Sequence, residues 1–193
     1  MKFMRLFSAD KYKGEKNYIN NQRTYEILRT ILLFALSAAV YLIGYLTTHS
    51  NKNLLTIVAV LGCLPAAKSA VNMIMFLRFK SCNKVVADEI ETNISGLVNA
   101  FDRVFTSYEK NYPIAHCAVK SGSIICFTEK DGFPEEDFYK HLNTYLKAEN
   151  HKDLTIKVFT DKQKYIERLN AMKELSSNGN EEAIMNVILS ITL

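Results

Sequence analysis

The chain has 193 residues, 48% of them hydrophobic, and a formal net charge of +4. This length fits one soluble domain, or two membrane helices followed by a domain of about 100 residues. Residues 1–83 carry 11 Lys and Arg against 3 Asp and Glu, whereas residues 84–193 carry 13 against 17. The second half therefore lacks the basic stripe that nucleic-acid-binding domains use to neutralise phosphates, and no nucleic-acid partner is expected.

Two apolar runs follow a basic arm over residues 1–26. The first, about residues 27–47, has no charge between Thr30 and Thr47, and the second, about residues 54–77, contains only Lys68. A helix of about 20 mostly apolar residues can cross the hydrocarbon core of a bilayer. We therefore predict a transmembrane hairpin over residues 27–80. A cleaved signal peptide is the alternative for the first run, but a polar arm of this length is untypical of signal peptides.

The positive charges predict which way the hairpin is oriented. Seven Lys and Arg precede or enter the first run, and others follow the second, whereas the loop over residues 48–53 holds only Lys52. Short segments rich in Lys and Arg stay in the cytoplasm. The expected location is the cell membrane, as a multi-pass protein with a cytoplasmic N-terminus and C-terminus. The expected lipid contact is the anionic inner leaflet of the bilayer.

Lys68 and Asn72 form the polar pair of the membrane region, one helical turn apart. Ionisable residues within a span are site candidates by default, because they usually face a bundle interior or a water-filled path. Lys68 lies about 21 Å along the predicted helix, so its side chain can also reach the cytoplasmic headgroups. We favour this snorkelling. Lining of a pore would require several copies of the hairpin.

Residues 84–193 are expected to form a cytoplasmic α+β domain. Apolar residues recur at alternating steps of three and four, which predicts one long helix over residues 87–108. This stripe comprises Ala87, Ile90, Ile94, Leu97, Phe101, Val104 and Tyr108. We favour an amphipathic helix that lies on the domain's own sheet over a coiled-coil stalk, since aromatic residues at core positions are poor coiled-coil choices.

A β-hairpin is predicted over residues 114–119 and 123–128, with a turn at Ser121 and Gly122. A two-residue loop places Cys117 opposite Cys126 at a non-hydrogen-bonded position of the ladder. Such a pair is close enough for a disulfide, which makes it a candidate redox pair. The favoured interpretation is a pair of reduced thiols that fill the core, as cytosolic cysteines usually are.

The remaining elements complete a small domain. A helix is expected to begin at Pro134, a strand to cover residues 154–159, and a capped helix to follow Asp161. The apolar run over residues 181–193 predicts a core or interface helix, with a strand as the alternative. Together these elements predict a small, mainly antiparallel sheet of three strands with helices on one face. Its edges need cover from the domain's own helices or from another protomer.

Motifs for chemistry are nearly absent. The chain has no Gly-rich phosphate loop and no Cys/His set at zinc spacing, so neither a cofactor nor a metal is expected. His141, Glu129 and Asp131 are weak catalytic candidates without an identifiable partner. The preferred role is a membrane-tethered interaction or regulatory domain without catalytic activity, which self-associates or binds a protein partner. The alternatives are an oligomeric pore or membrane-disrupting effector, and a membrane-bound hydrolase.

Overall fold

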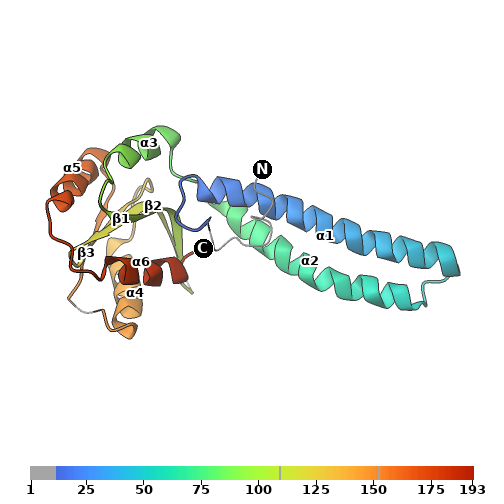
Figure 1. Ribbon diagram of the computed structural model, residues 1–193. Coiled ribbons are helices and arrows are strands. Elements are labelled where there is room, and N and C mark those ends of the chain that lie inside the picture. Colours follow the sequence, from blue (N-terminus) through green and yellow to red (C-terminus); the bar gives the residue numbers. More distant parts are fainter. Residues whose placement is uncertain (1–11, 109, 152) are drawn as a thin grey trace. The chain divides into compact units, whose positions relative to one another are not determined.

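The computed structural model describes residues 12–108, 110–151 and 153–193 (Figure 1). The chain divides into two compact units. Among the described residues, the hairpin unit comprises residues 19–80, and the sheet unit comprises residues 12–18 together with residues 81–193. The predicted basic arm over residues 1–26 lies partly outside the described residues.

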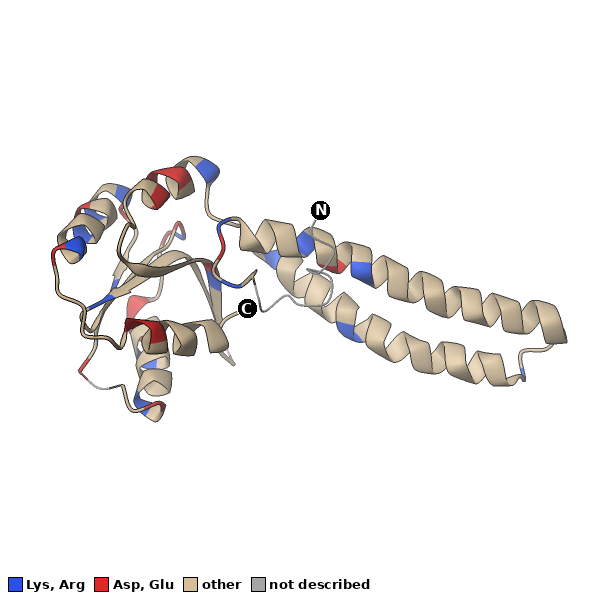
Figure 2. Ribbon diagram, viewed as in Figure 1, with Lys and Arg blue, Asp and Glu red and all other residues tan. Residues whose placement is uncertain are grey.

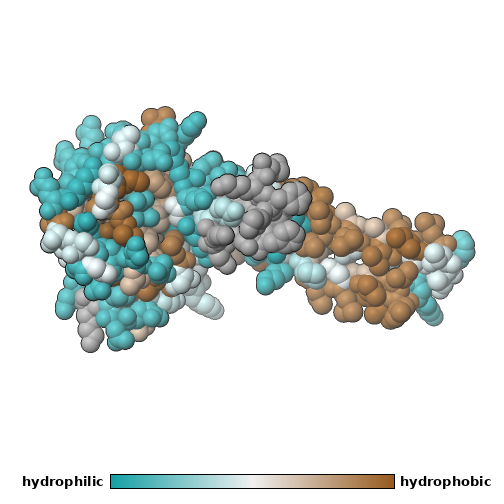
Figure 3. Space-filling model, in the orientation of Figure 1, coloured by the Kyte–Doolittle hydropathy of each residue, from teal (hydrophilic) through white to brown (hydrophobic). Residues whose placement is uncertain are grey.

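The hairpin unit consists of two long helices, α1 (Tyr18–Thr48) and α2 (Leu54–Arg78). Both are long and apolar enough to cross a membrane, and only 17% of each apolar window is buried. Figure 3 shows hydrophobic residues covering much of the hairpin surface. The helices include the predicted spans over residues 27–47 and 54–77, and α1 begins earlier because polar residues form its first turns.

Small and polar residues form the contact between α1 and α2. The hydroxyls of Thr30 and Ser69 lie 2.9 Å apart. A Cβ added to Gly62 would lie 2.8 Å from the Ser37 hydroxyl, so the two backbones approach closely there. Large apolar side chains point outward instead, as Leu36 does with 60% of its surface exposed. The hairpin therefore holds its helices together with little apolar burial.

The sheet unit contains the rest of the chain. Its elements are α3 (Lys84–Thr92), β1 (Val98–Thr106), β2 (Asn111–Lys120), β3 (Ser123–Phe127), α4 (Glu135–Ala148), β4 (Thr155–Phe159), α5 (Lys162–Lys173) and α6 (Glu181–Ser190). The strands lie in the order β1-β2-β3-β4. The first two pairs are antiparallel and β3 pairs with β4 in parallel, which gives the predicted α+β, mainly antiparallel fold.

Helices cover both faces of the sheet, which corrects the prediction of helices on one face. In one core, Phe138, Leu142 and Leu146 of α4 pack with residues of α6 such as Ile188. The core on the other face contains residues of α3 and α5, including Ile90, Tyr165, Leu169 and Met172. Figure 1 shows these helix pairs on opposite sides of the strands. Both faces carry apolar side chains, because each strand alternates between the two cores.

The predicted long helix over residues 87–108 is wrong. Helix α3 ends at Thr92, Gly96 adopts a positive φ of 77°, and residues from Val98 onward form β1, a fourth strand. Asp102 also has a positive φ, of 54°, and is missing from the otherwise continuous register with β2. Its conformation shifts the alternation of the strand, so that Phe101 and Phe105 face opposite cores. This shift hides the two-residue period of a strand.

Other local predictions are confirmed. The β2–β3 register pairs Lys120 with Ser123 and Cys117 with Cys126. Helix α5 is capped by Asp161, whose carboxylate accepts a hydrogen bond from the Lys164 N–H at 3.0 Å. The terminal run forms the favoured helix, α6, after which Thr192 makes a single bridge to Phe105.

Residues 12–18 belong to the sheet unit through several contacts. The Phe101 N–H donates to the Gly14 carbonyl at 2.9 Å. Lys16 forms ion pairs with Asp88 and Glu91 of α3. The Arg103 guanidinium lies 4.5 Å from the centre of the Tyr18 ring. The sheet unit thus includes chain from both sides of the hairpin.

A buried histidine links the sheet to α5. The Nδ1 atom of His116 lies 2.6 Å from the Tyr165 hydroxyl, and its Nε2 atom lies 3.4 Å from the side-chain oxygen of Asn99. Burial lowers the pKa of His116 to about 3. The imidazole therefore stays neutral in the folded protein at any ordinary pH.

The free energy of unfolding should fall as the pH decreases from about 6.5 toward 3. In this window the unfolded chain binds a proton at His116 that the folded chain does not bind. One such proton contributes a slope approaching about 1.4 kcal/mol per pH unit. Urea unfolding at a series of pH values measures the slope. His116→Asn should lose this contribution, and an unchanged slope in that variant would contradict the assignment.

Candidate functional site

Lys68 and Asn72 lie on α2, but not in its buried contact with α1. Lys68 is exposed and Asn72 is half-buried, whereas the neighbouring Ala66 and Ser69 are buried. Lys68 therefore lies on the outer surface of the hairpin. Snorkelling and pore lining both place it there, and the choice between them stays a prediction.

Cys117 and Cys126 are opposite each other and fully buried, and no disulfide joins them in this structure. Whether they act as a redox pair stays a prediction. Burial raises the pKa of Cys117 to about 12 and that of Cys126 well above its ordinary value. A thiolate is the reactive form of cysteine, so both side chains are poor nucleophiles. Cys82 is similar, because burial and then the charges of Glu129 and Asp102 raise its pKa to about 12.

His141 contacts neither of the two candidate acids, Glu129 and Asp131, in any interaction found among the described residues. Its ring lies between those of Tyr112 and Tyr145, with centroid distances of 5.6 and 5.1 Å, beside a pocket of about 440 Å³. Glu129 instead accepts a hydrogen bond from the Asn83 N–H at 3.3 Å. Burial lowers the pKa of His141 below its ordinary value.

Asp131 is exposed in the loop before α4, away from the pocket beside His141. Across residues 12–108, 110–151 and 153–193, no group of three His, Cys, Asp or Glu side chains is placed to hold a metal ion. No contact within these ranges brings His141, Glu129 and Asp131 together into one candidate catalytic site.

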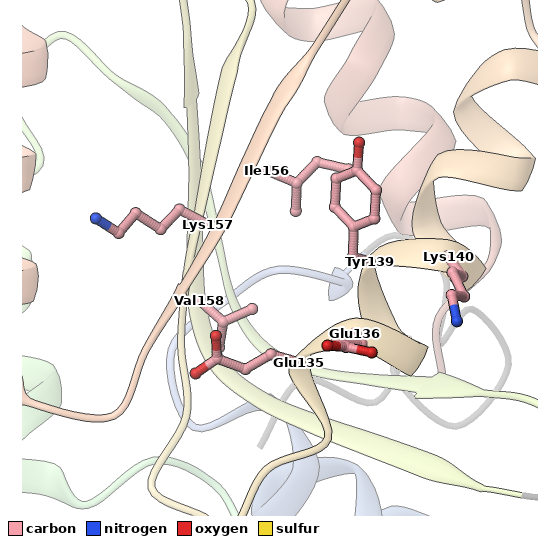
Figure 4. A pocket seen from close by; sticks show the side chains of 7 residues that line it. All are labelled: Glu135, Glu136, Tyr139, Lys140, Ile156, Lys157 and Val158. Atoms are coloured by element: carbon pink, nitrogen blue, oxygen red, sulfur yellow. The ribbon is translucent and has the colours of Figure 1, made fainter.

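A groove lies between α4 and β4 of the sheet unit (Figure 4). Its volume is about 310 Å³, and its lining includes Ile156 and Val158 of β4 and Tyr139 of α4. Tyr139 is 44% exposed. In Figure 4, Tyr139 lies beside Ile156, Glu135 lies beside Val158, and Lys157 points the opposite way. The groove therefore has an apolar floor with charged residues around it.

The backbone of β4 presents hydrogen-bonding groups to this groove. The Thr155 N–H donates to Gly122, and the Phe159 carbonyl accepts from Thr128, both at 3.0 Å. Successive residues of a strand direct their backbone groups to opposite sides. Lys157 therefore bonds toward β3, while the N–H and C=O of Ile156 and Val158 point outward. No backbone partner is found for them within the described part of the chain.

Charges are separated across β4. Glu135 and Glu136 are exposed in the first turn of α4, where the helix dipole favours acids. On the other face, the Lys157 ammonium lies 5.1 Å from the centre of the Phe159 ring. The α4 side of the groove is thus acidic at the start of the helix, near Val158, and carries Lys140 further along, whereas the opposite side of the strand carries Lys157.

None of the site residues predicted from the sequence lines this groove. One signal was present: Lys157 interrupts an apolar strand, and lysine is a common residue of exposed edge strands. The acids that begin α4 lie in its first turn, where the helix dipole favours them, but none of them makes a side-chain capping hydrogen bond in the described structure. The groove itself depends on the pairing of β4 with β3, which the local sequence pattern does not specify.

The two sheet cysteines should resist alkylation in the folded protein. Because both thiols are buried with raised pKa values, treatment with iodoacetamide at pH 8 should modify them only after unfolding in urea. Peptide mass spectrometry measures the modification at each site. Equal rates at Cys117 before and after addition of urea would show that the core is open.

The chain was compared with protein-family models, curated proteins and solved structures, and no match was found. Two features of the molecule bear on function: the outward-facing apolar surface of α1 and α2, and the groove beside β4.

Proposed function

We propose that this is a two-pass integral membrane protein that tethers a cytoplasmic α+β interaction domain to the inner leaflet. The observation that carries the proposal is the exposure of the two apolar helices, since only 17% of each window is buried. A core helix of a soluble protein would bury most of such a surface. Lipid is the solvent that suits these outward side chains.

The internal contact of the hairpin supports this proposal. Apolar side chains gain little by leaving lipid for one another, so membrane helices associate through small residues and polar contacts. Gly62 packs close to Ser37, and Thr30 meets Ser69 at hydrogen-bond distance. The two helices also approach closely near the turn. A Cβ added to Gly44 of α1 would lie 2.7 Å from the Cβ of Leu55 in α2.

The charged residues support the proposed orientation. Arg23 donates hydrogen bonds to the carbonyls of Phe76 and Phe79, which joins the start of α1 to the end of α2. Arg29 and Arg78 add positive charge to the same two helix ends, whereas the turn carries only Lys52 (Figure 2). Basic segments stay in the cytoplasm, so the start of α1 and the end of α2 are proposed to lie on the inner side of the membrane.

An interaction role is favoured over catalysis by the groove. It offers backbone groups, an apolar floor and charged margins, which are the parts of a recognition surface. The buried His116 and the sheet cysteines, by contrast, are held in their neutral forms. The self-association expected from the sequence stays a prediction.

The protein should remain in the membrane fraction after alkaline carbonate extraction. Replacing two outward residues, Leu36→Arg with Val60→Arg, should release it, because charges in the middle of a span are costly in lipid. The matched control adds the same charges in the turn, Ser50→Arg with Asn51→Arg, and should stay membrane-bound. Quantitative blotting of the two fractions measures release, and extraction of the unaltered protein would disprove the tether.

The orientation makes a separate prediction. An alkaline phosphatase reporter fused after Leu193 should be inactive, because the enzyme is active only outside the cytoplasm. The same reporter inserted beside Lys52 should be active, since the turn is proposed to lie outside. The reverse pattern would place the sheet unit outside the cell and would contradict the cytoplasmic location.

A further inference from the structure

The two edges of the sheet are treated differently. At the β1 edge, Phe101 bonds to Gly14, and the Leu193 N–H donates to the Val104 carbonyl at 3.0 Å. The chain therefore closes this edge with its own residues. At the β4 edge, the outward backbone groups of Ile156 and Val158 have no such cover within the described residues. An uncovered edge strand is a template for pairing with another segment.

We propose that the groove between α4 and β4 binds an extended segment of a partner protein as a fifth strand of the sheet. The segment runs parallel to β4 and places an acidic residue between two apolar residues, followed by a basic residue at the Val158 end. This inference names the partner of the domain described under the proposed function, and it rests on that function for the place where binding occurs. The binding itself requires only the sheet unit.

Backbone pairing provides the first part of the recognition. A strand laid beside β4 exchanges hydrogen bonds with the N–H and C=O groups of Ile156 and Val158. Lys157 does not take part, because its backbone groups already point toward β3. Strand addition therefore predicts protection of alternate amides along β4.

Side chains on the α4 face provide the second part. Residues of the added strand that pair with Ile156 and Val158 point to the same face as these two, beside the Tyr139 ring. Apolar side chains suit that floor. Glu135 and Glu136 lie at the Val158 end with exposed carboxylates, so a basic residue of the partner is favoured there.

Lys157 provides the third part and favours a different protein over a second copy. The residue of the added strand opposite Lys157 lies between the two apolar positions, and an acid there forms an opposite-charge pair. If two copies of β4 paired in the antiparallel register that uses Ile156 and Val158 of both, Lys157 would face Lys157. Like charges directly opposite each other destabilise a sheet.

Fluorescence anisotropy tests this pairing with the full-length protein in detergent micelles. The probe is a labelled peptide with valine, glutamate and valine at its centre, followed by threonine and arginine. We expect it to bind about tenfold more tightly than the same peptide with lysine in place of glutamate. Lys157→Glu should reverse this preference. Lys147→Glu makes the same charge change on an exposed part of α4 outside the groove and should leave the preference unchanged.

Hydrogen exchange adds a readout that general charge attraction would not give. The bound peptide should slow exchange at the amides of Ile156 and Val158 and leave that of Lys157 unaltered. The proposal is wrong if neither peptide binds, if Lys157→Glu behaves like Lys147→Glu, or if protection does not alternate. It is also wrong if the protein forms a dimer through β4 that excess peptide cannot dissociate.

The outcome separates this inference from the proposed function. Peptide binding is measured in micelles and does not depend on insertion into a bilayer. A protein that binds the peptide but leaves the membrane in carbonate would disprove the tether alone. A membrane-bound protein with the outcomes named above would disprove the peptide site alone.

Discussion

Backbone hydrogen bonding is the constraint on which both units depend. Inside α1 and α2 the N–H and C=O groups bond within each helix, which is the condition for crossing lipid. In the sheet, the same groups need a neighbouring strand. Gly14 and Leu193 provide backbone hydrogen bonds to the outer edge of β1. The outward N–H and C=O groups of Ile156 and Val158 in β4 have no backbone partner among the described residues. The proposed roles of anchoring and recognition follow from these two solutions.

The two units also differ in how they use polar residues. In the hairpin, a few small polar side chains such as Thr30 and Ser69 hold two otherwise apolar helices together. In the sheet unit, polar residues hold loops in place. The buried Glu181 carboxylate accepts hydrogen bonds from the backbone N–H groups of Ser121 and Asn178, and despite this burial these bonds lower the pKa of Glu181 to about 2. The first arrangement suits lipid, and the second suits water.

Local patterns predicted much of the architecture. Uninterrupted apolar length predicted the two long helices, and the Ser121–Gly122 turn predicted the β2–β3 register down to the opposed cysteines. Strand β1 was missed because Asp102, with its positive φ, breaks the alternation that identifies a strand. The groove was beyond sequence patterns, because it joins α4 to β4 through a parallel pairing of distant segments. Which edge stays open depends likewise on residues at both ends of the chain.

The composition of the sheet unit from residues 12–18 and 81–193 has a topological consequence. In sequence, the hairpin is an insertion in the sheet unit. The sheet unit therefore includes the segment before α1 as well as the chain after α2. Lys16 fastens the entering segment to α3 through Asp88 and Glu91. Cleavage at a single site between α2 and α3 would leave the sheet unit connected to the hairpin through residues 12–18. Separating the two units would require a second cleavage before α1.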